Sequence, residues 1–152
     1  MDIALLAIEA ADDAHAAHPD REWVIEVEES LEIIGDEHRL RQVLINLLSN
    51  VAAHTPKGTH ANVSVKRDGE YARIVVADNG PGIDPKLLPR LFDRFTRGDR
   101  ARNRAAGSTG LGLSIAHAIV QAHGGAIDVV SGAEGTAFTI HLPATSTDLT
   151  RD

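Results

Sequence analysis

The sequence predicts an α+β fold, a two-layer sandwich in which helices cover one face of a mixed, mostly antiparallel sheet. Apolar residues recur at helical spacing over residues 2–17 and 39–53. Alternating apolar and polar residues flank two glycine-containing turns, at 68–69 and 132–135, which is typical of β-hairpins. Strands that come both before and after helices, together with two hairpins, give the two layers.

The N-terminal third is expected to run from helix to strand to helix. The helix over 2–17 ends before Pro19, and alternating residues over 23–27 predict a half-exposed strand. A second, short strand is expected to end at Gly35. Asp36 is a good N-cap for the long helix that follows, because its side chain can accept a hydrogen bond from a free N–H group.

The rest of the chain is expected to form two hairpins separated by a loop and a helix. The first hairpin has strands over 61–65 and 72–76, and the second lies within 127–142. Residues 97–107 are polar and flanked by glycine, which predicts a mobile loop. An apolar helix then runs from the glycines at 107–112 to about residue 123.

Length and composition exclude several classes of protein. A chain of 152 residues fits one domain, expected over 1–143, followed by a disordered tail over 144–152. The formal net charge of −7 argues against a nucleic-acid partner. Without cysteine, the chain can form neither disulfides nor thiolate zinc sites. No apolar stretch approaches the roughly 18 residues that cross a bilayer, so we expect a soluble chain.

Two glycine clusters are the most informative feature of the chain. The first, over 78–82, follows an apolar strand, and the second, over 107–113, opens an apolar helix. Glycines allow positive φ and close approach of a ligand, and a helix N-terminus favours phosphate. Neither cluster matches the P-loop or the dinucleotide-binding fingerprint. The sequence therefore predicts a site that holds a nucleotide at both ends and binds ATP in a way that differs from both of these motifs.

The long helix carries Asn46 and Asn50 on one face, together with Gln42 and Ala53. Alone, these would indicate ordinary polar helix residues. With both glycine clusters they form a longer pattern, whose other segments are the lead-in over 35–44, the segment over 91–99 and the glycine-bounded segment over 132–138. This order resembles the ATP-binding catalytic domain of bacterial sensor histidine kinases, within the superfamily of gyrase, chaperone and mismatch-repair ATPases. The resemblance covers nearly the whole chain and implies a Bergerat-type fold with a mobile ATP lid.

The resemblance implies a role for each matching residue. Asn50 would coordinate the Mg²⁺ that bridges the triphosphate of ATP, and Asn46 would line the same site. Asp78 would accept a hydrogen bond from the adenine amino group, and Arg97 would be the catalytic lid cation facing the γ-phosphate. The other nucleotide-binding positions that the resemblance implies lie in the glycine loops, the lid and the last glycine-bounded segment: Gly80, Gly82, Phe95, Gly107, Thr109, Gly110, Leu111, Gly112, Leu113 and Thr136.

Some of these residues also suit plainer roles. Asp78 fits a cap of the turn that follows it, and Phe95 fits a core anchor of the lid. The family often has lysine or arginine three residues after the metal-binding asparagine, where this chain has Ala53. The lid arginines would then have to balance the triphosphate charge.

The resemblance also implies what this chain lacks. None of its eight histidines is followed by an acidic residue, as the family's phosphoacceptor histidine is. The expected function is therefore transfer of the γ-phosphoryl group of Mg-ATP to a histidine on a separate dimerising hairpin, with a response regulator downstream. We expect a monomeric isolated domain, a homodimeric full-length kinase, and a cytoplasmic location within a membrane-bound sensor kinase. An anti-sigma-type serine kinase and a degenerate nucleotide-binding docking module remain alternatives.

Overall fold

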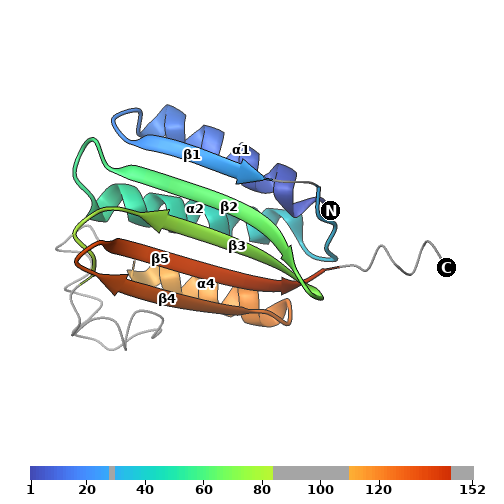
Figure 1. The fold of residues 1–152 in the computed structure, drawn as a ribbon. Helices are drawn as coiled ribbons and strands as arrows, with labels where there is room; N and C mark the ends of the chain where they lie inside the picture. Colours follow the sequence, from blue (N-terminus) through green and yellow to red (C-terminus); the bar gives the residue numbers. More distant parts are fainter. Residues whose placement is uncertain (28–29, 84–109, 145–152) are drawn as a thin grey trace.

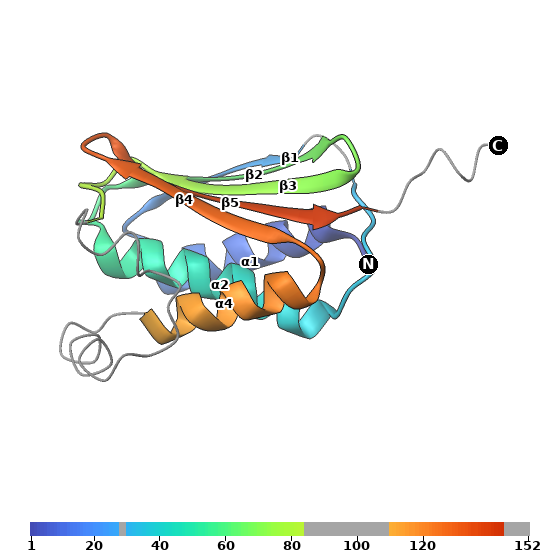
Figure 2. The same ribbon diagram turned by 90° about the horizontal axis from the view of Figure 1, so that it is seen from below.

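The computed structural model describes residues 1–27, 30–83 and 110–144. Three helices lie on one face of a five-stranded sheet, so the predicted two-layer α+β fold is confirmed (Figures 1 and 2). No helix in these three ranges is long and apolar enough to cross a membrane. The elements are α1 (Ile3–Ala17), β1 (Glu22–Val27), α2 (Glu37–His54), β2 (His60–Asp68), β3 (Tyr71–Asp78), α4 (Gly110–Ala122), β4 (Ala126–Gly132) and β5 (Gly135–Pro143).

The strand order β1-β2-β3-β5-β4 places β3 at the centre of the sheet. β1 and β2 are parallel, since α2 connects them across the sheet, and all other neighbours are antiparallel. Both predicted hairpins are present, β2 with β3 and β4 with β5. Asp78 ends β3 opposite Ala61 of β2 and Thr136 of β5. The carboxyl end of the central strand therefore lies between two neighbouring strands.

Aspartate side chains cap both N-terminal helices. Asp2 Oδ1 accepts hydrogen bonds from the N–H groups of Ala4 at 3.0 Å and Leu5 at 3.3 Å. Asp36 Oδ1 accepts from Arg39 N–H at 3.2 Å, which confirms the predicted N-cap of α2. This hydrogen bond holds the pKa of Asp36 below its ordinary value, since it favours the charged carboxylate.

The short strand predicted before Gly35 is wrong. Glu32 and Ile33 form only isolated bridges, to Asp2 and to Ala144. Ile33 N–H also donates to the carbonyl oxygen of Met1 at 2.9 Å, and Ile3 N–H donates to that of Leu31 at 2.9 Å, but α1 begins at Ile3, so the pairing with the N-terminal segment stops there. The alternating pattern is present because Ile33 is buried, although the segment joins no sheet.

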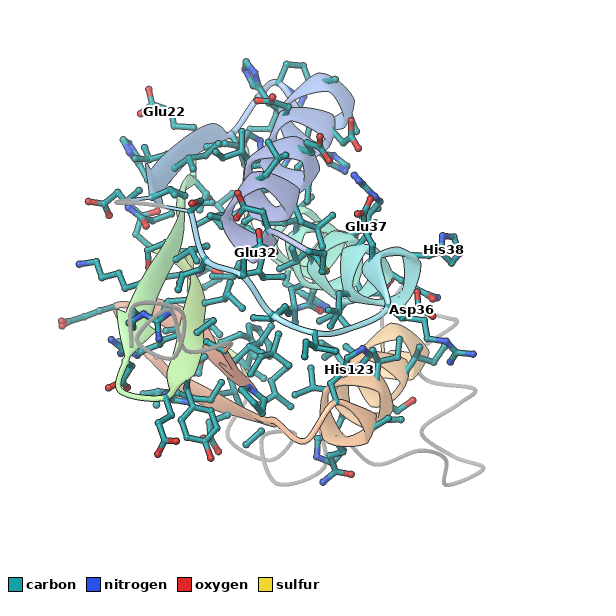
Figure 3. The ribbon with its side chains drawn as sticks, turned by 90° about the vertical axis from the view of Figure 1, so that its right-hand side faces the viewer. Glu22, Glu32, Asp36, Glu37, His38 and His123 are labelled. Carbon is teal, nitrogen blue, oxygen red and sulfur yellow. The ribbon has the colours of Figure 1, made fainter. Side chains whose placement is uncertain are left out.

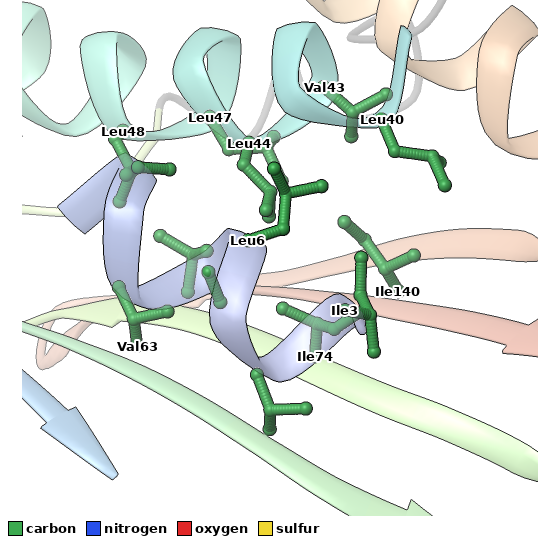
Figure 4. Packing of buried hydrophobic residues seen from close by; sticks show 14 of the residues in the cluster. Ile3, Leu6, Leu40, Val43, Leu44, Leu47, Leu48, Val63, Ile74 and Ile140 are labelled. Atoms are coloured by element: carbon green, nitrogen blue, oxygen red, sulfur yellow. The ribbon is translucent and has the colours of Figure 1, made fainter. Parts of the chain in front are cut away.

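The core lies between the helices α1, α2 and α4 and the inner face of the sheet, and Figure 4 shows part of it. α2 turns a continuous apolar stripe toward it, and Leu47, at the middle of that stripe, is fully buried. Burying a side chain of this size contributes roughly 1.5–3 kcal/mol. Because the inner face of α2 is anchored in this way, the side chains on its neighbouring faces are also fixed in direction. The stripe consists of Leu40, Val43, Leu44, Leu47, Leu48 and Val51.

A histidine joins the C-terminal end of α4 to the N-terminal end of α2 (Figure 3). His123 Nε2 accepts a hydrogen bond from Asp36 N–H at 3.0 Å, and its Nδ1 lies 2.8 Å from the carbonyl oxygen of Ile119. With Nε2 as acceptor, Nδ1 is the ring nitrogen placed to donate to Ile119. A Cβ at Gly35 would lie 2.7 Å from His123 Cδ2, so the ring packs directly on this turn.

Candidate functional site

Three segments distant in sequence meet at the carboxyl end of β3. Asp78 ends that strand, and Thr136 pairs with it from the start of β5. Thr55, the residue that ends α2, is in contact with the turn after β3, because a Cβ at Gly80 would lie 2.7 Å from Thr55 Cγ2. The structure therefore brings together the predicted residues Asp78 and Thr136, and adds Thr55, the C-cap of α2, to which the sequence assigned no role.

Asp78 is the central polar group of this corner. Its Oδ1 accepts a hydrogen bond from Gly80 N–H at 2.9 Å, which is the turn cap that the sequence allowed. Burial raises the pKa of Asp78, while the backbone N–H groups of Gly80 and Thr136 and the charge of His54 act against this. One carboxyl oxygen is sufficient for the turn, and a carboxyl has two. The capping role therefore leaves the proposed contact with adenine open.

Two glycines hold the loops of this corner against each other. Gly82 has φ +86°, and a Cβ there would lie 2.2 Å from the carbonyl oxygen of Gly132. Gly135 has φ +138°, and its Cβ would lie 1.9 Å from the carbonyl oxygen of Asp78. Only glycine fits either position. The sequence predicted that the backbone at Gly82 approaches a ligand, whereas the contact here is with the β4–β5 turn, and it treated Gly135 only as part of a hairpin turn.

Hydroxyl groups connect the same loops. Ser131 Oγ accepts a hydrogen bond from Ile83 N–H at 2.6 Å and lies 2.9 Å from Thr136 Oγ1. Thr136 is buried, so its hydroxyl contributes to holding the β4–β5 hairpin beside the segment that leaves β3. Sequence reasoning missed Ser131, because nothing in the pattern showed that the two glycine loops contact each other.

Asn46 and Asn50 lie one turn apart near the C-terminal end of α2. Asn50 is only 4% exposed, and Asn46 is half-buried. A neutral amide oxygen suits Mg²⁺, which takes oxygen ligands and keeps water and phosphate in its shell. The donor chemistry of α2 at this position therefore fits the metal that the resemblance implied.

His54, the last residue of α2, is a polar neighbour that sequence reasoning assigned no role. Burial lowers the pKa of His54, and the charge of Asp78 acts against this. His54 and Asp78 are brought near each other only by the fold, so the sequence held no indication of this proximity beyond the position of His54 after Ala53. Ala53 itself is exposed.

The other predicted residues divide into two groups. Gly110 begins α4, as predicted, and the side chain of Leu113 is buried in the core, so any contact of Leu113 with a nucleotide must come from its backbone. The predicted mobile loop at 97–107 lies outside the described residues, and so do Phe95, Arg97, Gly107 and Thr109. Their roles stay predictions.

Comparisons with known proteins agree on one family. Residues 35–146 match the family described as histidine kinase-, DNA gyrase B-, and HSP90-like ATPase. The chain is 44% identical over 144 residues to the probable sensor histidine kinase TcrY of Mycobacterium tuberculosis. That match covers 94% of this chain and 30% of TcrY, so the chain spans less than a third of this relative.

Solved structures show the same relationship. The mycobacterial sensor histidine kinase MprB superposes with a TM-score of 0.81 at 29% identity, covering 97% of both chains. The full-length histidine kinase ShkA in complex with AMPPNP superposes with a TM-score of 0.79 at 30% identity, covering 97% of this chain and 31% of ShkA. The chain therefore belongs to the family of histidine kinase-, gyrase- and HSP90-like ATPases, as an ATP-binding domain of the sensor histidine kinase type.

Proposed function

We propose that this chain binds Mg-ATP and transfers its γ-phosphoryl group to a histidine on a dimerising helical hairpin outside the chain. The proposal rests above all on one observation: the buried Asn50 lies one turn before the segment in which Thr55 contacts the Asp78 turn. An amide suited to Mg²⁺ and a carboxyl suited to adenine thus belong to one site.

The adenine end is assigned to the turn after β3. Asp78 would accept a hydrogen bond from the amino group of adenine, and a carbonyl at that place, as in guanine, would be disfavoured. Gly80 and Gly82 would let the backbone approach the base closely. Gly135 packs on the backbone of Asp78 and so fixes the residue that carries the carboxyl.

The phosphate end is assigned to α2 and the start of α4. Asn50, with Asn46 beside it, would hold Mg²⁺, which when bound neutralises charge on the phosphates. The N–H groups at Gly110 and Gly112 would face the phosphates from the N-terminal end of α4. Arg97 would meet the charge that develops at the γ-phosphate.

The transfer itself needs mainly positioning and charge neutralisation from this chain. A ring nitrogen of the partner histidine forms a bond to the γ-phosphorus, the bond from that phosphorus to the bridging oxygen breaks, and ADP leaves. The partner hairpin supplies the nucleophile, so this chain needs no catalytic histidine of its own.

The place of the domain in a larger protein follows from the same proposal. We expect the full-length kinase to be a homodimer in which the phosphohistidine passes its phosphoryl group to a response regulator. We expect the domain to lie in the cytoplasm, where ATP is available, as part of a membrane-bound sensor kinase.

The serine kinase of the anti-sigma type is not favoured, because relatives more than 40% identical are named as sensor histidine kinases. A docking module that has lost nucleotide binding is the other alternative, because Ala53 stands where the family often has a lysine or arginine. It retains the fold but needs neither Asn50 nor Asp78.

Calorimetric titration with ATP, with Mg²⁺ and with EDTA, separates these functions. We expect binding that Mg²⁺ strengthens, and we expect Asn50→Ala to remove that strengthening while the variant stays folded. Asn62→Ala is the matched control, since Asn62 lies on β2 and bonds Glu26 at 2.7 Å. No binding by the parent chain would identify a docking module, and an unchanged Mg²⁺ effect in Asn50→Ala would exclude Asn50 as the metal ligand.

A further inference from the structure

We infer that Arg21 is a positioning residue for the nucleotide site, acting through the C-terminal end of α2. The inference rests on the proposed nucleotide-binding function. Arg21 precedes β1, outside the stretch that matches the family, and the sequence pattern gave it no role. Its importance follows from its contacts.

The guanidinium of Arg21 reaches across the domain to the end of α2. Nη2 donates hydrogen bonds to the carbonyl oxygens of Ala52, at 2.7 Å, and Thr55. Nη1 donates to Asp20 Oδ1 at 2.7 Å, and this bond holds the pKa of Asp20 below its ordinary value. The side chain is only 10% exposed. Three oxygens from two segments therefore hold one buried cation.

These carbonyls are the groups that a helix leaves without intrahelical partners at its C-terminal end. Many helices end with a left-handed glycine, but α2 is capped by Thr55 in an extended conformation, with φ −126° and ψ 151°. The hydroxyl of Thr55 donates to the carbonyl oxygen of Val51 at 2.6 Å, and Arg21 satisfies the carbonyls beyond it. Arg21 thus takes the place of a capping glycine.

The last turn of α2 is also part of the site. It follows directly on Asn50, the proposed Mg²⁺ ligand, and it is capped by Thr55, whose methyl group lies against the Gly80 turn. A displacement of this turn would move the metal ligand and the wall of the adenine pocket together. Arg21 is connected to both because it holds Ala52 and Thr55.

The charge of Arg21 has a second effect at the same place. The C-terminal end of a helix carries a partial negative charge, which is unfavourable near a triphosphate. Ala53 brings no cation to this end, whereas Arg21 places one directly on its carbonyls. Its Nε is buried with no hydrogen-bond partner among the described residues. Burying this polar group costs free energy, which an apolar side chain packed at the same place would not.

Substitution of Arg21 tests the inference by affinity measured on folded protein. We expect Arg21→Gln to weaken Mg-ATP binding about tenfold by calorimetry, at a temperature where circular dichroism shows full folding. Arg21→Lys keeps the charge without the planar fork and should recover part of the loss. Arg39→Gln is the matched control, since Arg39 is exposed at the opposite end of α2 and pairs with Asp36 at 3.4 Å. It should bind like the parent.

A second readout does not need nucleotide. In ¹⁵N spectra of the ligand-free chain, the side-chain amide resonances of Asn46 and Asn50 should shift in the Arg21 variants and stay in place in Arg39→Gln. Unchanged resonances, or parent affinity in folded Arg21→Gln, would overturn the inference. If Arg21→Gln does not fold, the inference is overturned when Arg21→Lys binds Mg-ATP like the parent and shows the parent's resonances. Failure of the parent to bind Mg-ATP contradicts the proposed function instead, and the spectra still decide the role of Arg21.

Discussion

Asp78 and His54 are linked by charge at the edge of the site. Burial disfavours the charged form of each, so it raises the pKa of Asp78 and lowers that of His54. Each charge also stabilises the other when both are present. Burial thus favours the neutral form of both side chains, while the N–H groups of Gly80 and Thr136 favour the charged, accepting form of the Asp78 carboxyl.

Replacing Asp78 by Asn should change which base is bound. Asparagine keeps the size and can still accept from Gly80 N–H, so the turn should persist. Its amide can rotate and offer a donor, so ATP should bind about tenfold more weakly and the preference for ATP over GTP should narrow. Competition titrations with ATP and GTP measure both affinities, and Asp128→Asn, at an exposed position of β4, is the control. Discrimination as sharp as in the parent would show that Asp78 only caps its turn.

His54 should make folding stability depend on pH. Its pKa in the folded chain lies below the ordinary 6.5, so the unfolded chain binds more protons in the window just below that value. Stability from this group is therefore present above about pH 6.5 and is lost as pH falls through the folded pKa. In denaturant melts at about pH 7.5 and about pH 5.5, His54→Gln should lose less stability than the parent. Equal losses would show that His54 titrates normally.

At the scale of elements, the sequence predicted what local patterns determine. The apolar stripe of α2, the Asp36 cap and both hairpins are signals within short segments, and all three are present. The strand expected before Gly35 failed because its pairing with residues 1–3 stops where α1 begins, and its pairing after β5 is the single bridge of Ile33 to Ala144. Gly135 was underestimated, and Arg21 had no role, because their contacts join segments far apart in the sequence.

Two glycines with positive φ allow the stability cost of a close contact to be distinguished from the cost of a left-handed backbone conformation. Gly135 lies against Asp78, whereas a Cβ at Gly69, φ +62°, would meet nothing within 4 Å. Gly69→Ala should cost about 1 kcal/mol, from the left-handed backbone alone. Gly135→Ala should cost about 3 kcal/mol or more, because the Asp78 strand must also shift. Urea unfolding of the two variants tests this, and equal losses would show that the loops can separate freely.

At the scale of the whole molecule, the proposed site lies at the opposite end of α2 and α4 from the contact that joins these two helices. His123 joins α4 to the N-terminal end of α2, where Asp36 begins the helix. The other ends of these helices carry Asn50 and Gly110, and both belong to the proposed phosphate site (Figure 2). The core and the histidine contact thus hold the two helices at one end, and the proposed phosphate site lies toward the other.

On its own this chain should catalyse transfer of a phosphoryl group from ATP to a partner histidine without accepting that group itself. The most direct measurement is incubation of the chain with ATP labelled at the γ-phosphate and Mg²⁺, alone and with the dimerising hairpin of its own kinase as a separate polypeptide. We expect no acid-labile phosphohistidine on the chain alone and slow labelling of the hairpin histidine, since separation removes the high effective concentration of a covalent connection. Stoichiometric phosphohistidine on the isolated chain, or no label on the hairpin although ATP binds, would contradict the claim.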